Sequence, residues 1–347
     1  MNKSLTGSGS QAPRAPRVKA ASWPLKLGSW LVGALILSGV ILVIISRGEI
    51  EGFGRLLRRA APLWLLTGAF LQIATYFSAA AVWYQTLQKA GVRYSMRTLV
   101  PLGVAKLFSE QALPSGGVSG MAFFVAALTR RGIPAEISMS ALLVSLISYY
   151  AAYLLAAALS LTLLWFYHAA SAWIVIITIL FCIIAIAIPI GTLWLHSRSQ
   201  RPLPAWTTRI PGVNRLLDML GDAPGHLLRD GALLTKTTLF QASIFLLDAA
   251  TLWAMLRAVG QQVSFLATFP SLVVSSMVAT FGLVPSGLGT FEATCVLMLR
   301  TLGVPLDAAL AATLLLRGFT LWLPMLPGML LARREFKSSA AGDQGLQ

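Results

Sequence analysis

Five charged side chains lie inside long apolar stretches of this chain: Lys106, Glu110, Asp248, Glu292 and Arg317. A charge at the centre of a membrane-spanning helix costs about 2.5–3.5 kcal/mol to insert, so each of these residues is a candidate for a functional site. Lys106 and Glu110 are four residues apart and would share one helix face, either as a local ion pair that lets the helix insert or as part of a binding site. Arg317 is expected to pair with either Glu292 or Asp248.

The apolar stretches are interrupted twice by glycine, proline and serine, at 111–120 and 281–292. Lipid tolerates unpaired backbone groups only where protein or a water-filled cavity covers them, so each break predicts a discontinuous helix that lines a site. Glu292 would lie in the first turns of the helix after the second break. The free N–H groups and positive dipole end of that helix suit a phosphate or another anionic head group, although Glu292 could instead cap the helix. The lipid- or substrate-binding residues expected at the breaks are Pro114, Ser115, Gly116, Gly117, Pro285, Ser286, Gly287 and Gly289.

The composition is that of a multi-pass membrane protein. Hydrophobic residues make up 56% of the chain and charged residues 11%, whereas a soluble domain usually has about 25% charged residues. The net charge of +15 comes mostly from arginine and lysine in loops and tails. Control of topology and contact with anionic lipid head groups explain this charge better than nucleic acid, which is not expected as a partner.

The apolar pattern predicts an all-α polytopic membrane protein with six full spans and two re-entrant hairpins. Each hairpin has two arms, at 98–113 with 121–128 and at 265–284 with 293–299, and each arm is too short for a bilayer core that needs about 20 helical residues. The full spans are predicted at 27–46, 61–88, 137–167, 172–196, 232–259 and 306–331. Residues 1–26 read as a disordered basic tail, 27–335 as the transmembrane domain and 336–347 as a polar tail.

An internal repeat is indicated by a shift of 171 residues, which places Pro114-Ser115-Gly116 on Pro285-Ser286-Gly287 and Gly132 on Gly303. The alternative is a chance match between apolar segments of low complexity. Three full spans lie between the breaks, so the hairpins would enter from opposite faces. Halves at about 27–167 and 172–332 would form an inverted-topology repeat, as in transporters with discontinuous helices near the midplane.

The positive-inside rule predicts that both termini are cytoplasmic in a bacterial inner membrane. This orientation also places the loop at 197–231 and the Arg/Lys cluster after the last span in the cytoplasm, together with Lys89, Arg93, Arg97, Arg130 and Arg131 on either side of the first hairpin. The segment 47–60 does not fit, because its four arginines would lie outside, and it is expected to lie along the interface.

No enzymatic motif is present: the sequence lacks a Walker A pattern, a Gly-x-Ser-x-Gly elbow and a His-Glu-x-x-His helix. The two cysteines, Cys182 and Cys295, lie in apolar stretches without metal-ligand spacing, so neither a disulfide nor a metal site is expected. We therefore expect no catalytic residues and no cofactor.

Two motifs resemble the flippase-like transmembrane domain of lysylphosphatidylglycerol synthases (the multiple peptide resistance factor) and its stand-alone relatives. They are Leu113-Pro-Ser-Gly-Gly117, and Val284-Pro-Ser-Gly-Leu-Gly-Thr-Phe-Glu292 followed by Arg317. The resemblance implies lipid translocation between leaflets. In the synthases a soluble aminoacyl-transferase domain follows, and the few residues after the last predicted span leave no room for one. The chain would then be the transport half alone.

The leading hypothesis is a flippase that moves a phospholipid or an isoprenoid-type lipid without hydrolysing ATP, with anionic or isoprenoid membrane lipids as its partners. One alternative is a secondary transporter of a small anion, coupled to protons through Glu110 or Asp248. Another is a non-transporting accessory protein that binds an enzyme of envelope synthesis.

Overall fold

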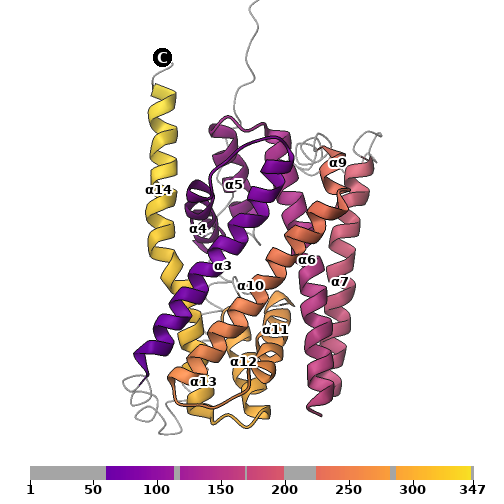
Figure 1. Ribbon diagram of the computed structural model, residues 1–347, viewed down its shortest axis with the longest axis vertical. Helices are drawn as coiled ribbons and strands as arrows, with labels where there is room; N and C mark the ends of the chain where they lie inside the picture. Colours follow the sequence, from indigo (N-terminus) through magenta and orange to yellow (C-terminus); the bar gives the residue numbers. More distant parts are fainter. Residues whose placement is uncertain (1–59, 113–117, 169, 199–223, 282–286, 345–347) are drawn as a thin grey trace, which may run out of the picture.

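The computed structural model describes residues 60–112, 118–168, 170–198, 224–281 and 287–344. These residues form helices and no β-strand, which confirms the predicted all-α polytopic fold (Figure 1). The first predicted span at 27–46, the basic tail and most of the 197–231 loop lie outside the described residues. Five described helices are long and apolar enough to cross a membrane, at Pro62–Lys89, Ala135–Phe166, Ala172–Trp194, Gly231–Ala258 and Leu306–Arg333.

Four of these spans belong to helices α3 (Pro62–Lys89), α6 (Ala135–Phe166), α7 (Ala172–Arg198) and α10 (Gly231–Ala258). The fifth is not one regular helix. It is built from α13 (Leu306–Arg317), a π-helical segment η3 (Gly318–Trp322) and α14 (Leu323–Gln344). A short helix, α9 (Gly225–Leu228), precedes α10.

Two helical hairpins lie between the spans, as predicted. The first consists of α4 (Met96–Ala112) and α5 (Val118–Arg130), and the second of α11 (Phe265–Phe281) and α12 (Thr290–Thr301). The longer arm of each hairpin has 17 residues, which reach about 25 Å, short of a hydrocarbon core of about 30 Å. Figure 1 shows the two hairpins in opposite halves of the molecule, so they enter from opposite faces.

The helices of the two halves correspond under the shift of 171 residues. It relates α3 to α10, α4 to α11, α5 to α12, and α6 to the last span. Corresponding neighbours also pack together in each half, for example α3 on α4 and α10 on α11. Gly132 and Gly303, which the shift superposes, both follow a hairpin and have φ angles of 81° and 84°.

Helices α3 and α10 lie side by side and antiparallel at the centre of the molecule (Figure 1), and we call their contact the crossing. The end of α3 meets the start of α10, where Lys89 Nζ lies 2.8 Å from Asp230 Oδ2. The start of α3 meets the end of α10, where the Ala61 N–H donates to the Ala258 carbonyl at 3.0 Å. The corresponding helices α3 and α10 therefore run in opposite directions, as an inverted repeat requires.

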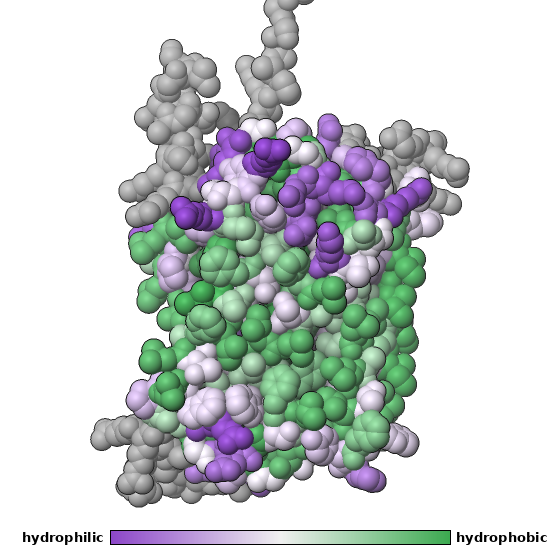
Figure 2. Space-filling model, viewed as in Figure 1, coloured by the Kyte–Doolittle hydropathy of each residue, from purple (hydrophilic) through white to green (hydrophobic). Residues whose placement is uncertain are grey.

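The surface has an apolar band between two polar ends (Figure 2). Helix α7 is the most apolar span, and its isoleucines at 176, 179, 183, 186 and 190 are exposed, as suits side chains that face lipid. We name one end the basic face, because it carries Lys89, Arg93, Arg97, Arg130 and Arg131 at the ends of α3, α4 and α5.

Asp230 is expected to stabilise the basic face in a pH-dependent way. Its side chain caps α10 by accepting from the Leu233 N–H at 2.9 Å, and its hydrogen bond with Lys89 is the main reason that its pKa is lowered. Asp230→Ala should lower the melting temperature at pH 7. Asp230→Asn, which keeps a capping oxygen but removes the charge, should lower it less.

Acidification provides the matching control for this prediction. Because the folded-state pKa of Asp230 is lowered, its contribution is present above the ordinary aspartate pKa of about 3.9 and is lost as the pH falls through the folded-state pKa. The difference in melting temperature between the native protein and Asp230→Ala should therefore shrink below about pH 4. Equal melting temperatures at pH 7 would contradict the contact.

Candidate functional site

An ion pair between Glu292 and Arg317 joins the second hairpin to the last span. Arg317 Nε donates to Glu292 Oε1 at 2.5 Å, and the two side chains are 2% (Glu292) and 11% (Arg317) exposed. The sequence left Glu292 and Asp248 open as partners of Arg317, and the structure contains the pair with Glu292. A buried ion pair is stable only if further hydrogen bonds satisfy its remaining polar atoms.

The turn before α12 supplies that further hydrogen bond. Glu292 Oε2 accepts from the Gly289 N–H at 2.6 Å, so the carboxylate caps α12 and also pairs with Arg317. Thr290 Oγ1 donates to the Gly287 carbonyl at 3.0 Å, which closes the turn. Gly287 and Gly289 have φ angles of 61° and 84°, a left-handed conformation that favours glycine.

Arg317 lies at a change of helix type, because it is the last residue of α13 and directly precedes the π-helical segment η3. π-Helical turns are rare and occur frequently at functional sites. The guanidinium also lies over the Phe291 ring, with 4.7 Å between Cζ and the ring centroid. The apolar pattern of the last span gave no indication of η3.

A second ion pair lies in the first hairpin. Lys106 Nζ donates to Glu110 Oε1 at 2.5 Å within α4, and the two side chains are 17% and 23% exposed. Gly120 on α5 faces this carboxylate, and a Cβ added there would lie 2.1 Å from Glu110 Cγ. The local ion pair of the sequence interpretation is therefore present. It remains partly accessible between the two arms.

Asp248 contacts neutral side chains at the crossing of α3 and α10. Gln72 Nε2 donates to Asp248 Oδ1 at 2.9 Å and to Thr251 Oγ1 at 3.1 Å. Both Gln72 and Thr251 are buried. No cation in the described part of the chain pairs with Asp248, so the pairing with Arg317 that the sequence allowed does not form.

Two tyrosines of α6 lie near polar groups of the neighbouring helices. The Tyr149 hydroxyl lies within electrostatic range of both the Glu110 and Asp248 carboxylates. One turn further along α6, the Tyr153 hydroxyl faces Ser276 and Thr280 on α11 without a hydrogen bond of standard geometry. Nothing in the spacing of the tyrosines at 149, 150 and 153 distinguishes Tyr149 from its neighbours.

The other predicted positions at the two breaks are Pro114, Ser115, Gly116, Gly117, Pro285 and Ser286, and they lie outside the described residues. Cys182 and Cys295 are free thiols. No group of three or more His, Cys, Asp and Glu side chains that could hold a metal ion occurs in the described ranges.

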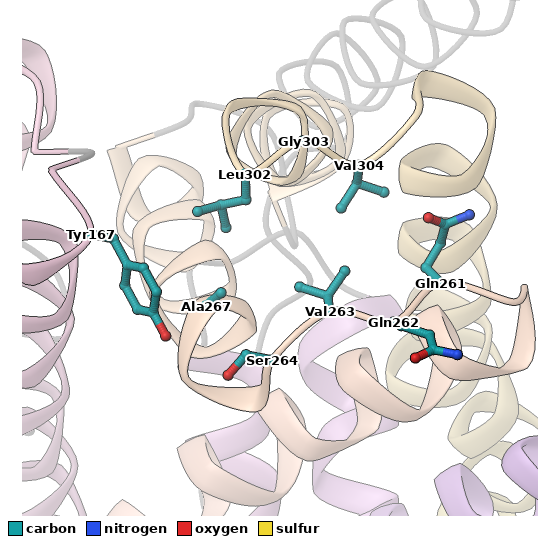
Figure 3. A pocket seen from close by; sticks show the side chains of 9 residues that line it. All are labelled: Tyr167, Gln261, Gln262, Val263, Ser264, Ala267, Leu302, Gly303 and Val304. Carbon is teal, nitrogen blue, oxygen red and sulfur yellow. The ribbon is translucent and has the colours of Figure 1, made fainter.

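A pocket of about 330 Å³ opens at the face opposite to the basic face (Figure 3). Its polar lining comes from Tyr167, Gln261, Gln262 and Ser264, and no charged side chain lines it. Gly303, another lining residue, follows the end of α12, whereas Glu292 lies at the start of that helix. The pocket is therefore separate from both ion pairs.

A protein-family model described as "Lysylphosphatidylglycerol synthase TM region" matches residues 30–328. The match includes both hairpins, both ion pairs and Asp248. The chain belongs to this family. No curated protein matches the chain.

Membership in the lysylphosphatidylglycerol synthase TM region family confirms the resemblance seen in the two Pro-Ser-Gly motifs. It makes the chain a multi-pass membrane domain related to lipid handling. The two ion pairs bring together both signs of charge: ammonium and guanidinium groups, which can donate to an anion such as a phosphate, and carboxylates, which can accept from a hydroxyl or an amine.

Proposed function

We infer that the protein moves a lipid, either a phospholipid or an isoprenoid-type lipid, between the two leaflets of a bacterial inner membrane. The family supports a lipid as the substrate. The observation that carries the proposal is that two hairpins of opposite orientation each bring an ion pair into the apolar part of the protein. Inverted repeats of this kind allow a central site to open alternately to the two sides.

The head group would travel between the hairpins while the acyl chains stay in the bilayer. Lys106 and Arg317 would donate to an anionic head group, and Glu110 and Glu292 would accept from its hydroxyl or amine groups. Exchange of an internal ion pair for contacts with the head group keeps every charge compensated, which lowers the cost of moving a polar group through the membrane.

The protein would work as a transporter and not as an enzyme. No covalent step and no ATP hydrolysis are required in this scheme. The basic face would lie in the cytoplasm, together with both termini, because cytoplasmic loops carry an excess of arginine and lysine.

Lys106→Gln should reduce lipid movement at least about tenfold, since a hydrogen bond to a charged group contributes about 1.5–3 kcal/mol and each 1.4 kcal/mol corresponds to a factor of ten. The measurement uses unilamellar vesicles that contain the purified protein and a fluorescent phospholipid. A membrane-impermeant reductant quenches the label in the outer leaflet, and the rate at which protected label becomes accessible is recorded.

Lys236→Gln is the matched control, because Lys236 is an exposed lysine on α10 outside both ion pairs, and it should move lipid at the native rate. The vesicle assay is repeated with an anionic phospholipid, a zwitterionic phospholipid and a polyprenyl phosphate. Vesicles with native protein that move none of these lipids faster than empty vesicles would refute the proposed function. Uptake of a small anion by the same vesicles would support the secondary-transporter alternative instead.

A further inference from the structure

Asp248 differs from the other intramembrane carboxylates of the described chain in lacking a cation. Glu110 is paired with Lys106 and Glu292 with Arg317, both at 2.5 Å. The amide of Gln72 is the hydrogen-bond donor to Asp248. One neutral donor does not compensate an ionised carboxylate in a medium of low dielectric, where charged side chains pair or mark ion pathways.

The groups that face Asp248 are neutral on every helix packed against α10. Tyr76 on α3 and Tyr149 on α6 are titratable groups within electrostatic range, and the charged residues of these two helices are Lys89 at the end of α3 and Glu136 at the start of α6. Helix α11 contains no charged residue, and the charged residues of α13 are Asp307 at its start and Arg317, which is bonded to Glu292. The charged residues of α10 itself, Lys236 and Arg257, lie toward its two ends.

Asp248 is also placed where a proton could arrive and leave. The Tyr76 hydroxyl is buried and has no hydrogen-bond partner among the described residues, so it is available as a donor or an acceptor. The Tyr149 side chain is 38% exposed although it stacks against Tyr150 and Tyr153. Asp248 is itself partly exposed, and Tyr149 lies within electrostatic range of both Asp248 and Glu110.

The position of Asp248 couples its charge to the movement of the two halves. Its hydrogen bond with Gln72 joins α10 in the second half to α3, the corresponding helix of the first half. A hydrogen bond to an ionised carboxylate is about twice as strong as one between neutral groups, so binding of a proton weakens this link. Gln72 can keep its second contact, to Thr251, in either state.

We propose that Asp248 is a proton-binding site that couples lipid movement to a proton gradient. A proton binds to the carboxylate when the crossing of α3 and α10 is accessible from one side of the membrane. Once neutral, the carboxylic acid can stay buried while the two halves rearrange and water is excluded from the crossing. The proton leaves on the other side of the membrane when the crossing becomes accessible from there. This inference rests on the proposed lipid movement, and it selects Asp248 over Glu110, whose charge Lys106 compensates.

The first test imposes a pH gradient on vesicles that contain native protein, Asp248→Asn or Asp307→Asn. Exchange of one proton for one lipid should shift the steady-state distribution of labelled lipid between leaflets by up to about tenfold per pH unit. Asp248→Asn should lose this dependence on the gradient. Asp307→Asn, which removes an aspartate from the start of α13 without touching the crossing, should keep it.

A sodium gradient at constant pH distinguishes the two possible coupling ions. A lipid distribution that follows sodium and ignores pH would overturn the proposal. So would a pH-dependent distribution that persists in Asp248→Asn.

The second test detects the proton without any lipid movement. Infrared difference spectra of the protein in lipid films, recorded between acidic and alkaline buffer, should show the carbonyl stretch of a protonated carboxylic acid. Other carboxylates of the chain contribute to this band as well, so the difference between variants carries the test: Asp248→Asn should lack one component of the band that Asp307→Asn keeps. If native protein moves no lipid but has the component that Asp248→Asn lacks, the proposed function fails while the proton site stands. If the band is unchanged in Asp248→Asn, the site itself is refuted.

Discussion

Replacing Arg317 with alanine should destabilise the protein by about 3–5 kcal/mol, the usual cost of removing one partner of a buried ion pair. The Glu292 carboxylate, which is 2% exposed, would remain buried without a cation. The variant would also lose the contact of the guanidinium with the Phe291 ring. Melting temperature in detergent measures the stability, and the fluorescent-lipid vesicle assay should show movement near the level of empty vesicles.

A second substitution separates charge from packing. Glu292→Gln combined with Arg317→Ala leaves no buried charge without a partner, and the glutamine can still cap α12 through the Gly289 N–H. The double variant should therefore recover most of the lost stability and still fail to move lipid, because the cation that would bind the head group is missing.

Arg300→Ala is the matched control for Arg317→Ala. Arg300 is an exposed arginine at the end of α12, and its replacement should change stability by no more than about 0.5 kcal/mol. If Arg317→Ala melts at the temperature of Arg300→Ala, the Glu292–Arg317 pair is accessible to water in the membrane and does not form a buried site.

The sequence located the charged residues of the site but did not decide which carboxylate pairs with Arg317. Hydropathy alone shows that Glu292, Asp248 and Arg317 lie in apolar stretches. Which carboxylate meets Arg317 depends on the rotation and depth of three helices. The packing of the helices sets this rotation and depth. The turn at Gly287 and Gly289 brings Glu292 to Arg317, whereas Asp248 is hydrogen-bonded to Gln72 on α3.

The repeat was predictable because proline and glycine interrupt helices in a way that leucine and valine do not. The two halves differ in where their charged residues lie. Under the 171-residue shift, Lys106 and Glu110 correspond to Met277 and Phe281, and Glu292 and Arg317 correspond to Met121 and Leu146. Each half therefore has its own ion pair in a different place, within one helix in the first half and between two helices in the second.

Other features of the site had no signal in the sequence. The π-helical segment η3 follows Arg317 in an apolar run that would equally suit an α-helix. Gln72 and Thr251 look like isolated polar residues until the antiparallel crossing of α3 and α10 places them beside Asp248. Such contacts arise from pairs of residues far apart in the chain, and composition and spacing do not report them.

Gly287→Ala should destabilise the second hairpin by about 2–5 kcal/mol, because two costs add. The φ angle of 61° is strained for alanine, which costs about 1–2 kcal/mol. A Cβ at this position would also lie 2.5 Å from Ala279 Cβ and 3.2 Å from Ala279 Cα on α11, and overpacking of this kind typically costs about 1–3 kcal/mol. The backbone of Ala279 cannot rotate away as a flexible side chain would, so the start of α12 has to shift.

Gly303→Ala separates these two costs, since Gly303 has a φ angle of 84° but no atom within 4 Å of an added Cβ. This substitution should lower the stability only through the strained backbone conformation, by about 1–2 kcal/mol, and should leave both ion pairs in place. Gly287→Ala should therefore melt at a lower temperature than Gly303→Ala, and it should also lose lipid movement, because a displaced α12 carries Glu292 away from Arg317. Equal melting temperatures would show that the turn at Gly287 does not pack against Ala279. Lower stability with undiminished lipid movement would show instead that the Glu292–Arg317 contact is not needed for transport.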